Sequence, residues 1–169
     1  MIRLAAVVLD DDEISELQGV FASNPDYWRL SGDLEPGAVT LEAVRDMVRA
    51  EAGVEGHEVL TARDGNGALV GYVELLLNHP RDGYPWIGFL LVHGEHRRKG
   101  LGRAIAGAVE ARLRGCGATA IGLGVLENNP EALAFWTALG CVELDRRPDV
   151  AKGRPTIVMR KALGSDVGG

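Results

Sequence analysis

Hydrophobic and polar positions in the first third of the chain alternate in patterns that predict a strand and two helices. Residues 2–8 predict a strand, and residues 10–24 carry apolar side chains at helical spacing until Pro25 ends the pattern. A loop rich in glycine and proline follows. Thr40 then stands where it can cap a second amphipathic helix over residues 41–52.

The middle of the chain has the pattern of paired strands. Two strand-like runs flank Asp64-Gly-Asn-Gly67, whose residues tolerate the positive φ of a tight turn, so residues 57–77 predict a hairpin. Residues 84–92 are apolar enough to predict a further strand buried on both faces. The segment that follows, residues 93–100, predicts a loop.

From that loop onward, helices and strands alternate. The pattern predicts helices over residues 101–117 and 128–140 and strands over residues 118–126, 141–147 and 154–163. Asn129 and Pro130 mark the start of the second of these helices. A strand, helix and parallel strand in succession form a βαβ unit, so the expected fold class is α/β with a mixed sheet.

Length and charge narrow the class of protein. With 169 residues, 46% of them hydrophobic, residues 1–163 are expected to form one domain, followed by a flexible tail over residues 164–169. The net charge of −6 argues against a nucleic-acid or membrane partner. Cys116 and Cys141 form no disulfide framework or metal-ligand spacing, so reduced thiols and no metal are expected. The short apolar run near Met1 has no cleavage-site pattern after it and no later run approaches the ~18 apolar residues of a membrane span, so a cytoplasmic location is expected.

Positive charge is nevertheless concentrated in one short segment, His96 to Ala104. It contains four cations and two glycines at the expected start of a helix, where backbone N–H groups and the helix dipole favour a phosphate. The spacing fits neither the nucleotide-binding G-x-x-x-x-G-K-[ST] loop nor the dinucleotide G-x-G-x-x-G loop, because Ile105 replaces the third glycine of the latter. A small anionic ligand other than ATP or NAD is therefore expected.

Two blocks of sequence resemble the Gcn5-related N-acetyltransferase (GNAT) superfamily. The first is Arg97-Arg98-Lys99-Gly100-Leu101-Gly102, which matches the family's acetyl-coenzyme A signature R/Q-x-x-G-x-G/A after a buried strand. The second begins at Asn129 and continues through Ala132 to the aromatic pair Phe135-Trp136 and a leucine-glycine pair. The resemblance covers roughly residues 57 to 147, and the order of the two blocks makes it specific.

The resemblance implies a fold and a cofactor site. The fold would be a three-layer GNAT arrangement, with a mostly antiparallel sheet of about seven strands flanked by about four helices. Acetyl-CoA would be the co-substrate. Its diphosphate would bind to the segment His96 to Ala104, called the basic loop from here on, and its pantetheine arm would lie along the strand that precedes this loop. The residues implied for cofactor binding are Leu91, Val92, Arg97, Arg98, Lys99, Gly100, Leu101, Gly102, Arg103, Ala104, Asn129 and Trp136.

The resemblance also implies direct attack by an amine on the thioester, with a backbone N–H stabilising the oxyanion. An alkylammonium of pKa ~10.4 must lose a proton before it attacks, whereas a thiol of pKa ~8.5 leaves readily, so a base matters more than an acid. Many family members carry a tyrosine acid where this chain has Trp136. The candidate bases are Glu74, which interrupts an apolar strand, and His79, which lies in the following loop. His93 and Glu95 are also available, but they lie beside the basic loop and are expected to shape it.

Three functions remain open at this point. The favoured one is an acetyl-CoA-dependent N-acetyltransferase acting on an amine of a small molecule or peptide. The alternatives are a non-catalytic acyl-CoA-binding sensor on the same fold, which the missing tyrosine motivates, and an anion-binding module without CoA. The acidic net charge favours a cationic acceptor. The protein is expected to act as a monomer or a homodimer. Four aromatic residues are candidates to line the acceptor site. These aromatic residues are Tyr27, Trp28, Tyr84 and Trp86.

Overall fold

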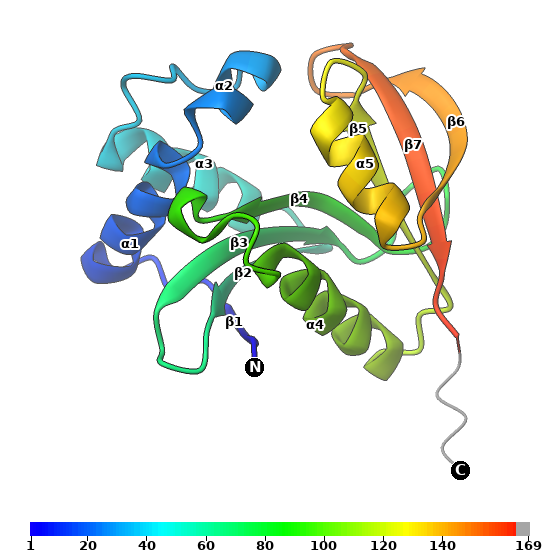
Figure 1. Cartoon of the computed structure of the whole chain (residues 1–169), viewed down its shortest axis with the longest axis horizontal. Coiled ribbons are helices and arrows are strands. Elements are labelled where there is room, and N and C mark those ends of the chain that lie inside the picture. Colours follow the sequence, from blue (N-terminus) through cyan, green and yellow to red (C-terminus); the bar gives the residue numbers. More distant parts are fainter. Residues whose placement is uncertain (165–169) are drawn as a thin grey trace.

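A seven-stranded sheet forms the centre of the computed structural model, which describes residues 1–164 (Figure 1). The strands are β1 (Arg3–Ala6), β2 (His57–Arg63), β3 (Leu69–Leu76), β4 (Trp86–Val92), β5 (Ala120–Leu126), β6 (Val142–Pro148) and β7 (Pro155–Ala162). Their order across the sheet is β1-β2-β3-β4-β5-β7-β6, and only β4 and β5 pair in parallel. The mixed, mostly antiparallel sheet is therefore confirmed, whereas residues 165–169 of the expected tail lie outside the described residues.

Five α-helices flank the sheet, and side-chain caps fix where several of them begin. They are α1 (Asp11–Ala22), α2 (Pro25–Ser31), α3 (Leu41–Ala52), α4 (Leu101–Gly115) and α5 (Pro130–Ala138). The Thr40 hydroxyl accepts a hydrogen bond from the backbone N–H of Ala43, as predicted. The Asn129 side chain caps α5 in the same way. None of the described helices has the length and apolar character needed to cross a membrane.

Helix α2 corrects the prediction of a loop after Pro25. Proline lacks a backbone N–H and has a fixed φ, so it ends a preceding helix and is equally suited to the first position of a new one. Here Pro25 does both, because α1 ends at Ala22 and α2 begins at Pro25. Gly32 ends α2 with a left-handed φ of 73°.

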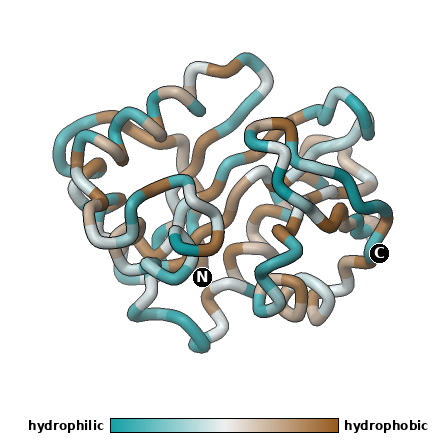
Figure 2. Tube along the Cα trace, turned by 90° about the horizontal axis from the view of Figure 1, so that it is seen from above, coloured by the Kyte–Doolittle hydropathy of each residue, from teal (hydrophilic) through white to brown (hydrophobic). Residues whose placement is uncertain are grey.

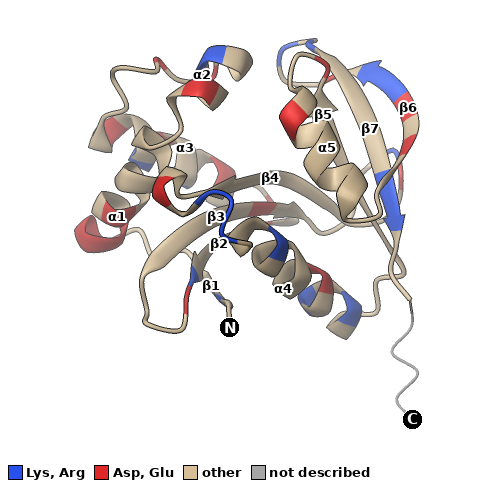
Figure 3. Cartoon of the chain, viewed as in Figure 1, with Lys and Arg blue, Asp and Glu red and all other residues tan. Residues whose placement is uncertain are grey.

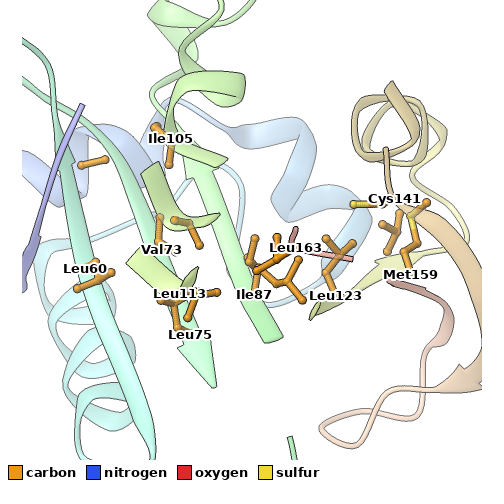
Figure 4. Close-up of a cluster of buried hydrophobic side chains, with 14 of the residues drawn as sticks. Leu60, Val73, Leu75, Ile87, Ile105, Leu113, Leu123, Cys141, Met159 and Leu163 are labelled. Atoms are coloured by element: carbon orange, nitrogen blue, oxygen red, sulfur yellow. The ribbon is translucent and has the colours of Figure 1, made fainter. Parts of the chain in front are cut away.

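The core consists of two hydrophobic clusters on opposite faces of the sheet. The first packs α4 against the sheet through Ile105, Val109 and Leu113 (Figure 4). The second packs α1, α2 and α3 against the other face, with Trp28 and Tyr72 among its largest side chains. Figure 2 shows hydrophobic stretches running through the inside of the molecule, while many of the outer turns are hydrophilic. The three layers are thus joined by apolar contact on both sides of the sheet.

Strand β4 is not buried on both faces, contrary to the prediction. Of its seven residues only Ile87 and Leu91 are buried, and Gly88 is exposed. The physical reason is that β4 separates from β5 beyond its first residues, so the second half of the strand borders open space. This separation is the feature on which the candidate site is built.

Candidate active site

The candidate site begins where β4 and β5 part. Only two residue pairs join these strands, Trp86 with Gly122 and Ile87 with Leu123. Against β3, β4 has an irregular register in which Phe89 faces Glu74 and Ile87 faces Leu75, so Gly88 is an extra residue without a partner. Such a bulge bends a strand and increases its local twist. The gap that opens contains a cavity of about 500 Å³.

One row of backbone groups on β4 faces this gap. The backbone N–H of His93 donates to the carbonyl of Val70 at 2.8 Å, so the backbone N–H and C=O groups of His93 point toward β3. Because these groups alternate in direction along a strand, those of Leu91 also point to β3, and those of Leu90 and Val92 point into the gap. Leu91 lines the cavity with the rest of β4, but the register favours Leu90 over Leu91 as a backbone partner for a ligand.

The basic loop lies at the edge of the same cavity and leads into α4 (Figure 3). Within residues 1–164, none of its four cations, Arg97, Arg98, Lys99 and Arg103, forms an ion pair with a carboxylate. Arg98 and Gly100 have left-handed φ values of 61° and 78°, which turn successive backbone groups at the start of α4. Cations without carboxylate partners beside free helix N–H groups suit a phosphate.

The structure divides the sequence-predicted residues of this loop into two groups. Arg97, Arg98, Gly100, Gly102 and Arg103 line the cavity. Lys99, Leu101 and Ala104 are not among the residues that line it.

Asn24, at the junction of α1 and α2, holds this loop against β4, and sequence reasoning missed it. Its amide nitrogen donates to the carbonyl of Val92 at 3.0 Å, and its side-chain oxygen accepts a hydrogen bond from the Arg97 guanidinium. The neighbouring Ser23 hydroxyl accepts the backbone N–H of Gly94 at 2.8 Å. Arg97 is therefore held by the protein itself, and Arg98 and Arg103 are the cations most available to a ligand.

Gly102 has a packing role that the sequence did not reveal. A Cβ atom built on Gly102 would lie 3.1 Å from the Phe135 ring, which belongs to α5 on the other side of the gap. Such an approach is tighter than ordinary van der Waals contact. The absence of a side chain at Gly102 therefore lets α4 and α5 approach each other at the cavity wall.

Helix α5 forms the wall of the cavity opposite β4. The Asn129 side chain accepts a hydrogen bond from the backbone N–H of Ala132 at 3.1 Å, so its oxygen is used to cap the helix. Trp136 lines the cavity and also packs against the core cluster, with its ring 4.8 Å from that of Phe135. This position agrees with a packing role for Trp136.

Glu74 lies on β3, next to the cavity, on the face covered by α1, α2 and α3. Its carboxylate accepts a hydrogen bond from the Tyr72 hydroxyl at 2.8 Å. Burial, helped by the nearby charge of Glu51, raises the pKa of Glu74 to about 7, against the opposing effect of the Tyr72 hydrogen bond. Glu74 does not line the cavity directly, but a Cβ on the cavity-lining Gly88 would lie 4.0 Å from the Glu74 Cβ.

His79 lies in the loop between β3 and β4 and is engaged in shaping it. Its Nδ1 accepts the backbone N–H groups of Arg81 and Asp82, and its ring stacks on Trp86 with 4.2 Å between the ring centroids. Burial lowers the pKa of His79. Neither Glu74 nor His79 is among the residues that line the cavity, but Glu74 lies against the cavity-lining Gly88, whereas His79 contacts its own loop and Trp86.

Of the four aromatic residues expected around an acceptor, Tyr27 alone is among the residues that line the cavity. Trp28 is 1% exposed and donates its indole N–H to the carbonyl of Phe21, so it belongs to the core. Tyr84 and Trp86 lie outside the cavity lining. Residues 1–164 contain no group of three or more potential metal ligands, and the expected lack of a metal stays a prediction.

Comparison with known families gives one family over most of the chain. The model described as the Acetyltransferase (GNAT) family matches residues 21–141. Mycothiol acetyltransferase of Kineococcus radiotolerans is 33% identical over 94 residues, which are 49% of this chain and 31% of that protein. Mycothiol acetyltransferase of Salinispora tropica is 46% identical over 57 residues, 33% of this chain and 18% of that protein. The chain thus matches less than a third of the length of these curated relatives.

Solved structures resemble the chain over nearly its whole length. An acetyltransferase from Thermus thermophilus is 25% identical, with a TM-score of 0.78, over 96% of this chain and 97% of that one. Spermidine N-acetyltransferase from Vibrio cholerae, solved with CoA and spermine, is 15% identical, with a TM-score of 0.72, over 97% of this chain and 96% of that one. The second likeness is one of fold alone.

Proposed function

The chain belongs to the acetyltransferase (GNAT) family, and from this premise we propose that it transfers an acetyl group from acetyl-CoA directly to an amine of a small molecule or peptide. The observation that carries the proposal is the cavity between β4 and β5. On one side it has the free backbone edge of β4, and at its rim it has basic side chains that form no ion pair within residues 1–164. Both features suit a ligand that combines an amide-containing arm with phosphates.

Residues of the basic loop would bind the CoA phosphates. Arg98 and Arg103 supply charge, and the first N–H groups of α4 supply directed donors. The backbone N–H and C=O of Leu90 and the backbone N–H of Val92 would pair with the amides of the pantetheine arm, as a further strand would, because the Val92 carbonyl already accepts from Asn24. Lys99, Leu101 and Ala104 would support the loop without lining the cavity.

Acetyl-CoA supplies an activated acyl group with a good thiolate leaving group. The backbone N–H of Leu90 or Val92, which points into the gap, would donate to the oxygen that becomes negative during attack. The attacking nucleophile is the acceptor amine, and no side chain of the protein needs to form a covalent bond. The leaving thiolate of pKa ~8.5 departs without strong help from an acid.

Glu74 is the general base in this proposal. An acceptor that arrives as an ammonium ion would transfer a proton to the Glu74 carboxylate, directly or through a water molecule, beside Gly88. The pKa of Glu74, near 7, leaves a large fraction ionised at neutral pH and makes the carboxylate a stronger base than an exposed one. The Tyr72 hydroxyl holds one oxygen of the carboxylate and fixes its orientation.

Trp136 is expected to pack and not to donate a proton. Replacing Trp136 by phenylalanine should leave kcat within a few-fold of the original and should leave the alkaline side of the pH profile unchanged, because indole does not ionise near neutral pH. The measurement is kcat against pH for both proteins. A large rate increase in a Trp136→Tyr variant would show instead that an acid was missing.

The charge of the basic loop should be measurable in CoA affinity. Arg98→Ala removes a cation that has no ion-pair partner in the described chain, and it should weaken CoA binding by ~1.5–3 kcal/mol, the range for a hydrogen bond to a charged group. The difference should shrink at high salt, because added ions screen the contact. Calorimetric titration with CoA gives both values. Arg112→Ala, which removes an α4 cation bound to Glu58, is the control, and an equal loss in both variants would contradict the assignment.

For the acceptor we propose a chemical class and not a single compound. The acidic net charge favours a cationic amine, and the similar proteins include mycothiol acetyltransferases and a spermidine N-acetyltransferase. Several expectations remain predictions. These are a cytoplasmic location, a single domain over residues 1–163, the absence of nucleic-acid, membrane and metal partners, and the option of a homodimer. The second candidate function, a CoA-binding sensor, rests on Trp136 replacing the tyrosine found in many family members.

Release of free CoA thiol in the presence of a panel of amines tests the proposal. The panel contains polyamines, aminoglycosides and peptide amines, each incubated with acetyl-CoA. At least one amine should stimulate thiol release well above its rate without enzyme. Stabilisation of the protein by CoA with no stimulation by any amine would favour the sensor.

A further inference from the structure

The end of α2 is tied to the hairpin between β6 and β7 by several charged contacts. The Arg154 guanidinium donates to the carbonyl of Ser31 at 2.7 Å and to the Asp33 carboxylate at 3.1 Å. The Lys152 ammonium lies 2.8 Å from the same Asp33 oxygen and donates to the carbonyl of Gly32 at 3.2 Å. We call Asp33, Lys152 and Arg154 the ionic clasp.

Hydrogen bonds within the β6–β7 hairpin and the carbonyls at the end of α2 favour these contacts. On the hairpin, the Asp149 carboxylate accepts the backbone N–H groups of Lys152 and Arg154 and the Arg154 side chain at 2.7 Å, which orients both cations. On α2, the carbonyls of the last turn present the negative end of the helix to these cations. A further contact, from the Asn128 amide to the carbonyl of Leu30 at 3.1 Å, lies beside the clasp.

The clasp closes the open end of the gap between β4 and β5. At one end, the two residue pairs of β4 and β5 join the walls of the gap. At the other end, α2 and the loop between β6 and β7 face each other at the top of the view in Figure 1, and the clasp joins them. The candidate site therefore lies in a ring of structure and not in an open cleft.

A second cavity, of about 470 Å³, adjoins the central one at the clasp. It is lined by Leu30, Leu126, Glu127, Asn128, Arg154 and Pro155. Leu30 and Leu126 also line the central cavity, so these two side chains stand between the two spaces. Arg154 of the clasp is part of the wall of the outer one.

The clasp is weak enough to open. The side chains of Lys152, Asp33 and Arg154 are 46%, 23% and 25% exposed, so water and salt compete with their contacts. Partly exposed ion pairs of this kind contribute little individually. At this end of the gap, the described contacts between the walls are the clasp and the hydrogen bond from Asn128 to Leu30. The other contacts, which include the β4–β5 pairing and the ion pair between Arg147 and Asp82, lie elsewhere, so loss of the clasp should widen the passage between the cavities.

From this arrangement we propose that the ionic clasp is a gate between the outer and the central cavity, and that the acceptor amine passes through it to reach the acyl group. The proposal rests on the proposed function, because it assigns a route to the acceptor. The clasp narrows the constriction formed by Leu30 and Leu126 when it is closed. Opening the clasp admits a bulky cationic acceptor and releases its acetylated product.

A reporter thiol in the central cavity tests the gate without requiring a known acceptor. In a Cys116→Ser background, which removes the exposed thiol, Ala132→Cys places a cysteine in the lining of the central cavity, while Cys141 stays buried with a raised pKa. Desulfo-CoA covers the cofactor side, and its binding is checked separately by thermal shift. The probe is a methanethiosulfonate that carries a trimethylammonium group, which mimics a bulky ammonium.

Asp33→Asn should accelerate labelling of the reporter by roughly 3- to 30-fold, the shift expected for loss of two partly exposed ion pairs. Lys152→Gln should act in the same direction with a smaller effect, because Arg154 still binds Asp33. The matched control is Glu143→Gln, which breaks an exposed ion pair with Arg146 on the same hairpin without touching α2, and it should leave the labelling rate unchanged.

Hydrogen exchange of the amides in residues 30–33 and 150–154 reports the opening of the clasp independently. If Asp33→Asn accelerates this exchange but not the labelling, the clasp is structural and the gate is wrong. If neither rate changes, the clasp does not hold the two walls together, and the proposal also fails. Failure of desulfo-CoA to bind would contradict the proposed function instead, and the thermal shift would reveal it.

Discussion

Replacing Glu74 by glutamine is expected to lower kcat by ~10²–10⁴-fold, the usual contribution of a general base, while the affinity for CoA stays the same. Glutamine keeps the shape of the side chain and can still bond to Tyr72, but it cannot accept the proton of the acceptor ammonium. Raising the pH should partly restore the rate, because more of the amine is then neutral. The measurement is kcat against pH with an amine that the enzyme acetylates.

The dependence of kcat on pH in the original enzyme should show the ionisation of Glu74. With the pKa of Glu74 at about 7, turnover should fall as the pH drops below that value and the carboxylate becomes protonated. Tyr72→Phe removes a hydrogen bond that lowers this pKa, so the fall should move to higher pH. Turnover of Glu74→Gln within a few-fold of the original would place the base elsewhere, and His79→Asn would then be the next variant.

Loss of CoA binding is the expected result of Gly102→Val. The Cβ alone would come within 3.1 Å of the Phe135 ring, and the branched side chain would push α4 and α5 apart where the first N–H groups of α4 face the ligand. Stabilisation of the folded protein by CoA in a thermal-shift assay should therefore disappear. Far-ultraviolet circular dichroism shows whether the variant remains folded.

Gly107→Val is the matched control for this experiment. Gly107 lies in the same helix and is exposed, and a Cβ there would meet nothing within 4 Å. The control should retain its CoA response, since valine is no worse than glycine inside a helix. An unchanged response to CoA in a folded Gly102→Val protein would mean that the start of α4 is not where the phosphates bind.

The fold was largely predictable because periodicity reports which side chains are buried. The hairpin, the βαβ unit and the cap at Thr40 each follow from local chemistry that acts within a few residues. The short helix α2 was missed because Pro25 signals both an end and a start. The bulge at Gly88 was also missed, since it depends on how β4 pairs with β3 and not on its own sequence.

The site was predictable where a motif lies within one loop and not where distant segments meet. The basic loop and Glu74 stand out as charge in unexpected surroundings. Asn24 does not stand out, although it bonds to both Val92 and Arg97, because its partners lie about seventy residues away. The ionic clasp is hidden for the same reason, with Asp33 more than a hundred residues from its partners. Long-range pairs of this kind form only once the chain is folded.

The fate of an isotopically labelled acetyl group tests the central claim most directly. The enzyme is incubated with acetyl-CoA labelled in its acetyl carbons and with the panel of amines, and the products and the intact protein are followed by mass spectrometry. Direct transfer predicts that the label is found on the nitrogen of an acceptor, with one free CoA thiol per acetylated amine and no label on the protein. Label retained on CoA throughout, or found on a side chain of the enzyme, would contradict it.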